Sequence, residues 1–288
     1  MSTLHIIGGN GFVGASVGLY IQSLANVDLA VGLYGRNELD LLKPEQVNKF
    51  FSSIEPDDVV LVAAAVSRLT DNSYQCFKDN CDMAENLATA IKNHGPVNHL
   101  IYLSSIDVYG QQTHNKILCE QSALAPEDYY ACSKVAGESL LKIAFKETPG
   151  SLSIFRLTGI YGPNDKGKSL IGSFTRRLID KKPIMLFSGG SSLRDYVYVD
   201  DLAEIIHESI KKNVSGVFNI ATGRSLRIKE IAEAIQKNIC PEEDRLTFSD
   251  ESDRNYDLEF DTGKLQGAFP GFRFRKIDQG IADYLRHS

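Results

Sequence analysis

The sequence predicts an α/β protein built on a doubly wound parallel sheet, with a smaller C-terminal substrate lobe interleaved with it. Three observations support this prediction. Strand-like apolar runs alternate strictly with helix-like patterns up to residue 157, as expected for parallel strands joined by right-handed crossovers. The first of these runs ends at closely spaced glycines. After Pro163 the pattern changes to short elements, and no Pro/Gly/Ser linker separates the two parts.

The first apolar run, over residues 4–7, ends at a glycine-rich turn that precedes a predicted helix. The turn fits G-x-x-G-x-x-G with Gly8, Gly11 and Gly14, and it also fits G-x-G-x-x-G when counted from Gly9. Both patterns let the backbone turn sharply, approach a pyrophosphate and pack a helix tightly on a strand. The helix N-terminus adds free N–H groups and partial positive charge. This context predicts a Rossmann-type dinucleotide site; the alternative is a plain strand–helix turn.

The second predicted strand, Leu29–Tyr34, is followed by Gly35-Arg36-Asn37. In this fold an acid near that point binds the ribose 2′-hydroxyl, whereas an arginine accommodates a 2′-phosphate. Arg36 therefore favours NADP as the cofactor. The alternative is NAD, with Arg36 as a solvated loop charge.

The remaining elements follow in order. Pro44 suits the first turn of a helix over 44–54, and the apolar run 58–65 predicts a buried parallel strand that ends in alanines. A helix over 80–93 opens with Asn80, and a strand over 99–103 delivers Ser104–Gly110 at its carboxyl end, where open α/β sheets bind ligands. The later predictions are a surface loop over 111–128, helix 129–146, strand 151–157, a break at 159–163, a polar loop over 164–168, helix 169–181 and strand 183–187.

Further along, Asp200 or Asp201 is expected to cap a helix over 202–211, and Ser225 a helix over 227–238. A strand over 216–220 can return to the main sheet, and a last helix is expected near 277–285. The predicted division is 1–157 with 195–222 for dinucleotide binding, and 158–194 with 223–288 for the substrate.

Composition excludes several classes of protein. The net charge of −6 and the lack of a long basic run argue against nucleic acid as a partner. No apolar stretch is long enough to cross a bilayer, and the N-terminus lacks a signal-type pattern. The five cysteines form no C-x-x-C pair and do not cluster with the six histidines. We therefore expect reduced thiols, a cytoplasmic location and no metal site.

Tyr130 and Lys134 lie four residues apart in the predicted helix 129–146, so they share one face. A nearby ammonium favours the phenolate of a tyrosine, which can then exchange a proton with a carbinol or carbonyl. Ser105, at the end of a neighbouring strand, can hydrogen-bond the same substrate oxygen. The alternative, two surface residues on one helix face, is disfavoured by the glycine turn and the Ser-Ser strand end.

Together these motifs resemble the extended short-chain dehydrogenase/reductase family, which contains nucleotide-sugar epimerases, dehydratases and ketoreductases. The resemblance covers nearly the whole chain. It rests on the following segments: Gly8–Gly14, 63–65, Asn80 with Asn86-Leu87, Ser104–Gly110, Tyr130 with Lys134, Arg156 with Tyr161-Gly162-Pro163, and Arg194–Ala203.

The resemblance implies a catalytic set of Ser105, Tyr130 and Lys134, with Lys134 also holding the nicotinamide ribose. The implied cofactor-binding residues are Gly8, Gly11, Phe12, Val13, Gly14, Arg36, Asp40, Leu41, Ala63, Ala64, Ala65, Asn80, Tyr130 and Lys134. The implied substrate-binding residues are Ser67, Ser105, Gly159 and Arg194. Arg194 would bind the nucleotide diphosphate, a role that suits a guanidinium; the alternative is an ion pair with Asp195 or another acid. A homodimer through helices that include the one with Tyr130 is also implied.

Departures from the family pattern limit which of the family's reactions we expect this chain to catalyse. Family members often have Asn where this chain has Gly159. The 4,6-dehydratases have Asp-Glu after the catalytic hydroxyl residue, whereas Ile106-Asp107 follows Ser105 here. The segment 36–43 resembles 4-keto-sugar reductases and GDP-fucose synthase-like enzymes, but the catalytic Cys of the latter is missing from Ser104–Tyr109.

We therefore predict an NADP(H)-leaning oxidoreductase acting on a nucleotide-linked sugar, in the first place a 4-keto-sugar reductase. One alternative is a nucleotide-sugar 4-epimerase with tightly bound NAD. An alternative of another class is a non-catalytic dinucleotide-sensing protein, which would be expected to lose the Ser105, Tyr130 and Lys134 set that this chain retains.

Overall fold

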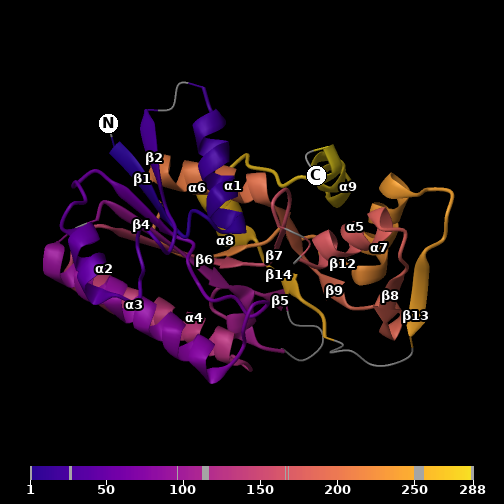
Figure 1. Cartoon of the computed structure of the whole chain (residues 1–288), viewed down its shortest axis with the longest axis horizontal. Helices are drawn as coiled ribbons and strands as arrows, with labels where there is room; N and C mark the ends of the chain where they lie inside the picture. Colours follow the sequence, from indigo (N-terminus) through magenta and orange to yellow (C-terminus); the bar gives the residue numbers. More distant parts are fainter. Residues whose placement is uncertain are drawn as a thin grey trace. The chain divides into compact units, whose positions relative to one another are not determined.

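The computed structural model describes residues 2–25, 28–95, 97–111, 117–165, 167, 169–249 and 256–286. The chain divides into two compact units, each assembled from separate stretches of sequence (Figure 1). Unit 1 comprises Met1–Gly110, Ala123–Leu157 and Ala203–Phe218, and unit 2 comprises Gln111–Ser122, Thr158–Leu202 and Asn219–Ser288. The predicted domain bounds differ from these units over 111–122, 195–202 and 219–222, and they stay a prediction.

A parallel sheet of six strands has the order β11-β6-β4-β3-β1-β2. Its strands are β1 (Ser2–Ile7), β2 (Leu29–Tyr34), β3 (Val59–Val62), β4 (His99–Ser105), β6 (Ser151–Leu157) and β11 (Gly216–Ile220). Every residue of β3 and β4 is buried, as expected for strands covered on both faces. The strand order reverses at β1, between β2 and β3, and ligands bind at the carboxyl ends of strands at such a point.

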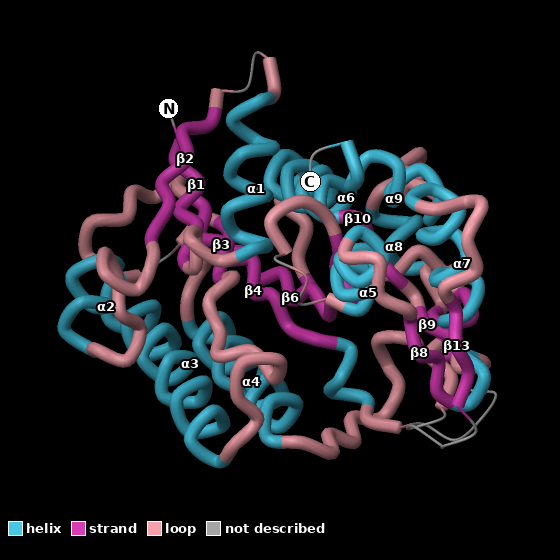
Figure 2. The backbone as a smooth tube through the Cα atoms, turned by 45° about the vertical axis from the view of Figure 1, so that its right-hand side comes forward, coloured by secondary structure: helices cyan, strands magenta, loops and turns pink. Residues whose placement is uncertain are grey.

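Helices cover both faces of this sheet. They are α1 (Phe12–Ser23), α2 (Pro44–Phe51), α3 (Tyr74–His94), α4 (Tyr129–Glu147) and α6 (Val199–Lys212), with a short 3₁₀ helix, η1 (Ile106–Tyr109). α3 and α4 lie side by side along one face, with α2 beside α3, and α1 lies on the other face (Figures 1 and 2). Leu87, Ile91 and Leu141 of α3 and α4 bury their side chains against Val60 and Leu100 of the sheet.

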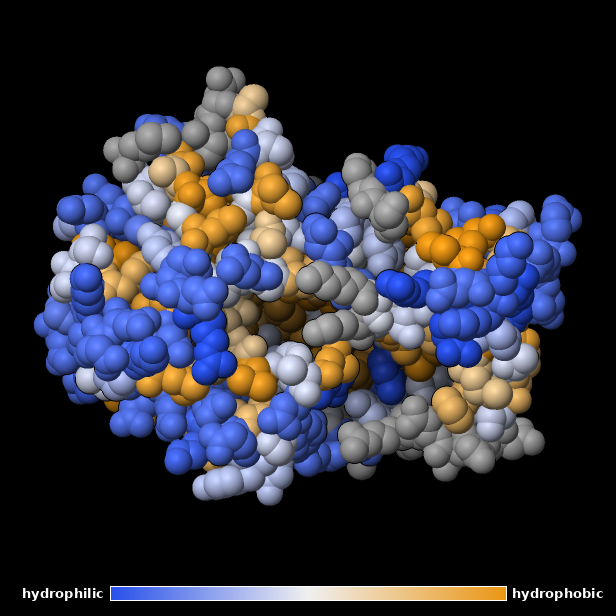
Figure 3. All heavy atoms as spheres, viewed as in Figure 1, coloured by the Kyte–Doolittle hydropathy of each residue, from blue (hydrophilic) through white to orange (hydrophobic). Residues whose placement is uncertain are grey.

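The space-filling view shows how these helices meet solvent. Hydrophilic side chains dominate the face around α2 and α3, whereas hydrophobic side chains gather over α1 and β2 (Figure 3). Leu19 of α1 is 57% exposed and Leu33 of the edge strand β2 is 39% exposed. Within the described ranges, no helix combines the length and apolar character that a membrane span requires.

Three predictions of where a helix begins or which residue caps it were wrong. α3 begins at Tyr74 rather than near Asn80, because the Ser73 hydroxyl accepts the Cys76 N–H and caps it. Neither Asp200 nor Asp201 caps α6, which already begins at Val199. Ser225 does not cap α7 (Ile228–Ile239): its hydroxyl donates to the Leu258 carbonyl, and Arg227 is the N-cap.

Unit 2 consists of paired short strands and helices. The parallel pairs are β7 (Gly159–Tyr161) with β10 (Tyr196–Tyr198), β8 (Ile184–Phe187) with β13 (Leu246–Ser249), and β5 (Ile117–Leu118) with β14 (Glu259–Phe260). β9 (Leu193–Arg194) pairs with β12 (Leu226–Arg227) in the antiparallel sense. The helices are α5 (Leu170–Ile179), α7, α8 (Gly263–Ala268) and α9 (Ile277–Arg286), with the 3₁₀ turn η2 (Ser188–Gly190).

Unit 2 corrects two further predictions. Residues 159–161 were expected only to break the preceding strand, but they form β7, because Tyr196–Tyr198 supplies a partner strand. The predicted loop over 111–128 contains β5, which pairs with a strand more than 100 residues later in the chain. Its residues 112–116, and residues 166 and 168 of the predicted loop over 164–168, lie outside the described ranges.

Candidate active site

Gly8, Gly11 and Gly14 shape the turn between β1 and α1. Gly8 has a φ of +92°, and a Cβ there would come within 2.6 Å of the Ala64 backbone nitrogen. A Cβ on Gly14 would come within 2.4 Å of the Gly8 carbonyl oxygen. Gly11 is the N-cap of α1 and supplies no capping side chain. The first N–H groups of this helix therefore remain available to a phosphate.

A cavity of about 260 Å³ lies beside this turn, at the carboxyl ends of β1, β2 and β3. Eight of the predicted cofactor residues line it: Gly8, Gly11, Arg36, Asp40, Leu41, Ala63, Ala64 and Ala65. The cavity wall also includes residues that were not predicted to bind the cofactor, namely Ile7, Asn10, Gly35, Leu39, Leu42, Val66, Asp79 and Met83. Asp79 was missed because the first two turns of α3 were not predicted to be helical, whereas Met83 lies within the predicted helix over 80–93 and carried no motif. Phe12, Val13, Gly14, Asn80, Tyr130 and Lys134 are outside this lining.

Arg36 lies at the rim of the cavity with its side chain 74% exposed. Its Nε is 3.4 Å from the Asp40 Oδ2, and the other Asp40 oxygen accepts the Leu42 N–H. Glu38 is also close, because its carboxylate accepts the Gly35 N–H at 2.9 Å. One carboxylate, that of Asp40, therefore pairs with the guanidinium predicted to bind a 2′-phosphate, and a second, that of Glu38, is held at the neighbouring Gly35 backbone.

The Asn80 side chain connects two segments of unit 1 by hydrogen bonds. Its Oδ1 accepts the Val66 N–H at 2.8 Å, and its Nδ2 donates to the Val66 carbonyl and to the Ser133 hydroxyl. The buried amide thus ties the segment after β3 to α4, and its cofactor role stays a prediction. Ser67, the residue after Val66, has its hydroxyl 3.1 Å from the Thr70 hydroxyl.

The three predicted catalytic residues all lie in unit 1, at the end of β4 and in the first two turns of α4. Asp128 caps α4 by accepting the Ala131 N–H, and the Asn72 side chain accepts the Tyr130 N–H at 3.1 Å. Lys134 is buried; its Nζ donates to the Leu103 carbonyl at 2.8 Å and lies 5.7 Å from the centre of the Tyr130 ring.

Ser105 does not direct its hydroxyl proton at Tyr130. The hydroxyl donates to the Asp107 Oδ2 at 2.9 Å and accepts the Asp107 N–H at 3.1 Å. The other oxygen of Asp107 pairs with Arg68 at 3.0 Å. In the sequence, Asp107 stands out only as one acid where the 4,6-dehydratases have two. A carboxylate two residues after a serine is the signal that could have suggested this hydrogen bond.

Burial controls the charge state of the predicted catalytic residues. It lowers the pKa of Lys134 to about 8, against the opposing effect of Glu138. Burial also raises the pKa of Tyr130, and the Asp107 carboxylate raises it further. Burial and Asp107 thus oppose the phenolate that Lys134 was predicted to favour, and the catalytic role of Tyr130 stays a prediction.

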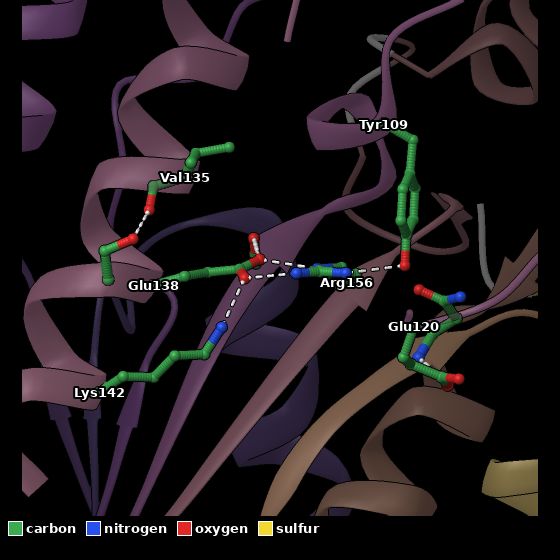
Figure 4. Close-up of polar contacts among 9 residues, drawn as sticks. Tyr109, Glu120, Val135, Glu138, Lys142 and Arg156 are labelled. Atoms are coloured by element: carbon green, nitrogen blue, oxygen red, sulfur yellow. Dashed lines mark hydrogen bonds and ion pairs between the residues drawn. The ribbon is translucent and has the colours of Figure 1, made fainter. Parts of the chain in front are cut away.

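A buried ion-pair network lies next to the predicted catalytic residues in sequence, at Ser104 before Ser105 and at Glu138 after Lys134. Glu138, one turn after Lys134, receives Arg156 Nε and Nη2 on its two carboxylate oxygens at 2.9 and 2.7 Å. Ser104 donates to one of these oxygens, and Arg156 also donates to the Tyr109 hydroxyl at 2.8 Å (Figure 4). The network therefore joins β4, β6, η1 and α4.

Gly159 and Arg194 lie in unit 2. A Cβ on Gly159 would come within 2.4 Å of the Tyr196 ring, so Tyr196 leaves no room for a side chain at the place of the family's Asn. Arg194 donates to the Leu193 and Tyr256 carbonyls and stacks 4.5 Å from the Tyr256 ring. Asp195, considered above as its ion-pair partner, instead accepts from Thr222 and Gly223. The substrate roles of Gly159 and Arg194 stay predictions.

Comparison with known proteins shows the family to which the chain belongs. A model of the NAD dependent epimerase/dehydratase family matches residues 4–221. The chain belongs to this family. The prediction of an NAD(P)-dependent enzyme of the short-chain dehydrogenase/reductase type is thereby confirmed, and so is the predicted α/β fold.

Curated relatives of this epimerase/dehydratase family member include reductases, dehydratases and epimerases of nucleotide sugars. The chain is 28% identical over 254 residues to a probable GDP-L-fucose synthase from Oryza sativa, covering 81% of this chain and 76% of that protein. It is 30% identical over 205 residues to a trifunctional UDP-glucose 4,6-dehydratase/UDP-4-keto-6-deoxy-D-glucose 3,5-epimerase/UDP-4-keto-L-rhamnose-reductase from Arabidopsis thaliana. That match covers 69% of this chain and only 31% of the longer plant protein.

Solved structures share the fold over the full chain. RMD from Pseudomonas aeruginosa, complexed with NADPH, matches with a TM-score of 0.84 and 23% identity, covering all of both chains. UDP-glucose 4-epimerase from Thermus thermophilus, complexed with NAD, matches with a TM-score of 0.83 and 22% identity, covering 99% of this chain and 98% of the other. Solved structures with this fold thus occur with either cofactor.

Proposed function

We propose that this family member is an NADP(H)-dependent reductase of a 4-keto group on a nucleotide-linked sugar. The observation that carries the proposal is the position of Ser105 at the end of β4 and of Tyr130 and Lys134 in the first two turns of α4, with the Lys134 Nζ 5.7 Å from the centre of the Tyr130 ring. A protonated tyrosine is the acid that ketone reduction needs. The names of the rice and Arabidopsis relatives, a GDP-L-fucose synthase and a UDP-4-keto-L-rhamnose reductase, support this class of substrate.

The residues around the cavity fit a dinucleotide. The close packing of Gly8 and Gly14 leaves the backbone at the α1 N-terminus open to a pyrophosphate, and the small side chains of 63–65 line the cavity beside it. A bound reduced nicotinamide supplies the hydride. Lys134 would hold the nicotinamide ribose, Ser105 would bind the substrate oxygen, and Tyr130 would deliver its proton to that oxygen as the carbinol forms.

A nucleotide-sugar 4-epimerase with tightly bound NAD is the second candidate. The observation that favours it is the presence of Glu38 and Asp40 near Arg36, since carboxylates at this point of the fold suit a ribose 2′-hydroxyl. The two candidates differ in cofactor use, because an epimerase regenerates its cofactor in each cycle whereas a reductase consumes it.

Cofactor consumption therefore tests the proposal. The protein is incubated with NADPH and with UDP-4-keto-L-rhamnose or a GDP-linked 4-keto-6-deoxyhexose. We expect loss of NADPH absorbance in a one-to-one ratio with the reduced sugar. Product without net NADPH loss would overturn the reductase in favour of the epimerase. Mass spectrometry of the nucleotide that co-purifies with the protein gives an independent check, because an epimerase of this kind retains NAD.

Arg36→Ala tests cofactor choice. We expect the dissociation constant for NADPH to rise about 10- to 100-fold, as loss of a charge-assisted hydrogen bond predicts, while that for NADH changes little. Isothermal titration of both cofactors measures this ratio. Lys43→Ala is the matched control, since Lys43 is an exposed cation nearby that is outside the cavity lining. Equal weakening of NADPH and NADH, or of neither, would contradict a 2′-phosphate role.

The cytoplasmic location and the homodimer stay predictions of the sequence. The same holds for the nucleotide-sugar partner, whose diphosphate we assign to Arg194.

A further inference from the structure

Ser105 is the N-cap of η1, and its hydroxyl makes two hydrogen bonds with Asp107 of that helix. A hydroxyl has one proton to donate and two lone pairs that accept. In the structure the Ser105 proton is given to the Asp107 Oδ2, and one lone pair accepts the Asp107 N–H. One acceptor position remains for a substrate. In this state Ser105 can accept a hydrogen bond from a carbinol, but it has no proton with which to donate a hydrogen bond to a ketone.

A proton on Asp107 reverses this arrangement. The carboxylic acid would donate to the Ser105 Oγ, whose two lone pairs would then accept the Asp107 N–H and O–H. The Ser105 proton would be free for a ketone oxygen, which can only accept. The ionised state of Asp107 therefore matches a carbinol, and the protonated state matches a ketone.

We propose that Asp107 is a positioning residue that switches Ser105 between hydrogen-bond acceptor and donor by gaining or losing one solvent proton, and that Arg68 sets the pH of this switch. The proposal rests on the reductase function above. It adds one consequence: binding of a ketone is coupled to uptake of a proton by Asp107.

The surroundings of Asp107 raise its pKa above the usual range of an aspartate. Burial raises the pKa of Asp107, and the carboxylate of Asp128 at the N-cap of α4 adds to this, whereas Arg68 and the Ser105 hydrogen bond lower it. Arg68, from the segment before α3, is 44% exposed, while Asp107 is 15% exposed. Tyr130 of α4 also faces Asp107, since the Asp107 carboxylate raises the pKa of Tyr130. Solvent can therefore reach the switch on the side of Arg68.

Asp107→Asn is the first test, because the asparagine amide can donate to Ser105 as the protonated acid would. In the wild type we expect kcat/KM for ketone reduction to fall as pH rises through the Asp107 pKa. In the variant this decrease should disappear, and kcat/KM for carbinol oxidation at neutral pH should drop about tenfold, which corresponds to one hydrogen bond of about 1.4 kcal/mol. An unchanged pH profile in Asp107→Asn would overturn the proposal.

Arg68→Gln is the second test. Loss of the positive charge raises the pKa of Asp107, so the decrease in kcat/KM should move to higher pH, and Arg68→Lys should restore it towards the wild-type position. Lys92→Gln is the matched control; it removes an exposed cation near the far end of α3, where Lys92 pairs with Glu147. A role that is only structural would lower activity at all pH values without moving the profile, and this outcome would also overturn the proposal.

An activity-independent measurement separates this inference from the proposed function. Infrared difference spectra between acid and neutral pH, recorded on the protein without substrate, should lose the signal of one titrating carboxyl group in Asp107→Asn. If wild type fails to consume NADPH with keto sugars but this signal is lost in Asp107→Asn and moves in Arg68→Gln, the reductase function fails and the Asp107–Arg68 switch stands. A spectrum identical in wild type and Asp107→Asn would refute the switch.

Discussion

Tyr130→Phe is expected to lower kcat for ketone reduction by about 10³-fold, within the range that a positioned general acid contributes. The substitution removes the only proton that the proposed mechanism delivers to the substrate oxygen. The backbone should not change, because Tyr130 is held there by its N–H bond to Asn72 and by the Asp128 cap of α4. Initial rates of NADPH oxidation measure the effect.

Tyr129→Phe provides the control for this experiment. Tyr129 is the preceding residue of α4; it is 47% exposed and packs against Tyr74 and Phe77 by its ring alone. It should keep wild-type turnover. Cofactor affinity of Tyr130→Phe, measured by fluorescence titration with NADPH, should stay nearly unchanged. Activity that survives in Tyr130→Phe would show that another group supplies the proton, and the mechanism would be wrong.

The pKa of Tyr130 decides which role the phenol takes first. A phenol whose pKa is raised by burial stays protonated at neutral pH, so Tyr130 begins as a proton donor rather than as a base. Binding of an oxidised nicotinamide would bring a positive charge that lowers this pKa. The charge of ionised Asp107 raises the same pKa, and a proton on Asp107, the state proposed above to bind a ketone, removes that contribution.

Features that depend on local pattern were predicted well from the sequence. The glycine turn, the strict alternation of strands and helices and the return of 216–220 to the main sheet all follow from periodicity and turn chemistry. The spacing of Tyr130 and Lys134 also placed both in one helix. These features need only a few neighbouring residues to be specified.

Features that depend on contacts between distant segments were not predicted. The Tyr196 ring explains why Gly159 carries no side chain, but only strand pairing brings these residues together. The short strand Ile117–Leu118 is too brief to show a period, and its partner lies at Glu259–Phe260. The hydrogen bonds of the Asn80 amide to Val66 and Ser133, 14 and 53 residues away, were not predicted either.

Arg156→Met is expected to lower the free energy of unfolding by about 3–5 kcal/mol, the usual cost of leaving one member of a buried ion pair unpaired. Glu138 and Arg156 have side chains that are 1% and 3% exposed, and the two carboxylate oxygens of Glu138 both accept from the guanidinium. Tyr109 would also lose the hydrogen bond that it accepts from Arg156. Urea denaturation followed by circular dichroism gives the value.

The double variant Glu138→Leu/Arg156→Met decides whether the loss comes from the stranded charge. Replacing both members of a buried pair by apolar side chains is often close to neutral, so we expect the double variant to be more stable than Arg156→Met alone. If the double variant is as unstable as the single one, the packing of Arg156 rather than its charge would account for the loss.

The same pair predicts how stability depends on pH. Burial alone would raise the pKa of Glu138, but hydrogen bonds and charge from Arg156, with Ser104 and Lys142, lower it overall. A carboxyl whose folded pKa is below its unfolded value, about 4.3, stabilises the protein above that value and loses the contribution as pH falls through the folded pKa. Glu138→Gln should therefore reduce the loss of stability on acidification.

Because the network joins the elements that carry Ser105 and Lys134, Arg156→Met should also lower kcat at neutral pH, whereas a network with no role in positioning them would leave kcat unchanged.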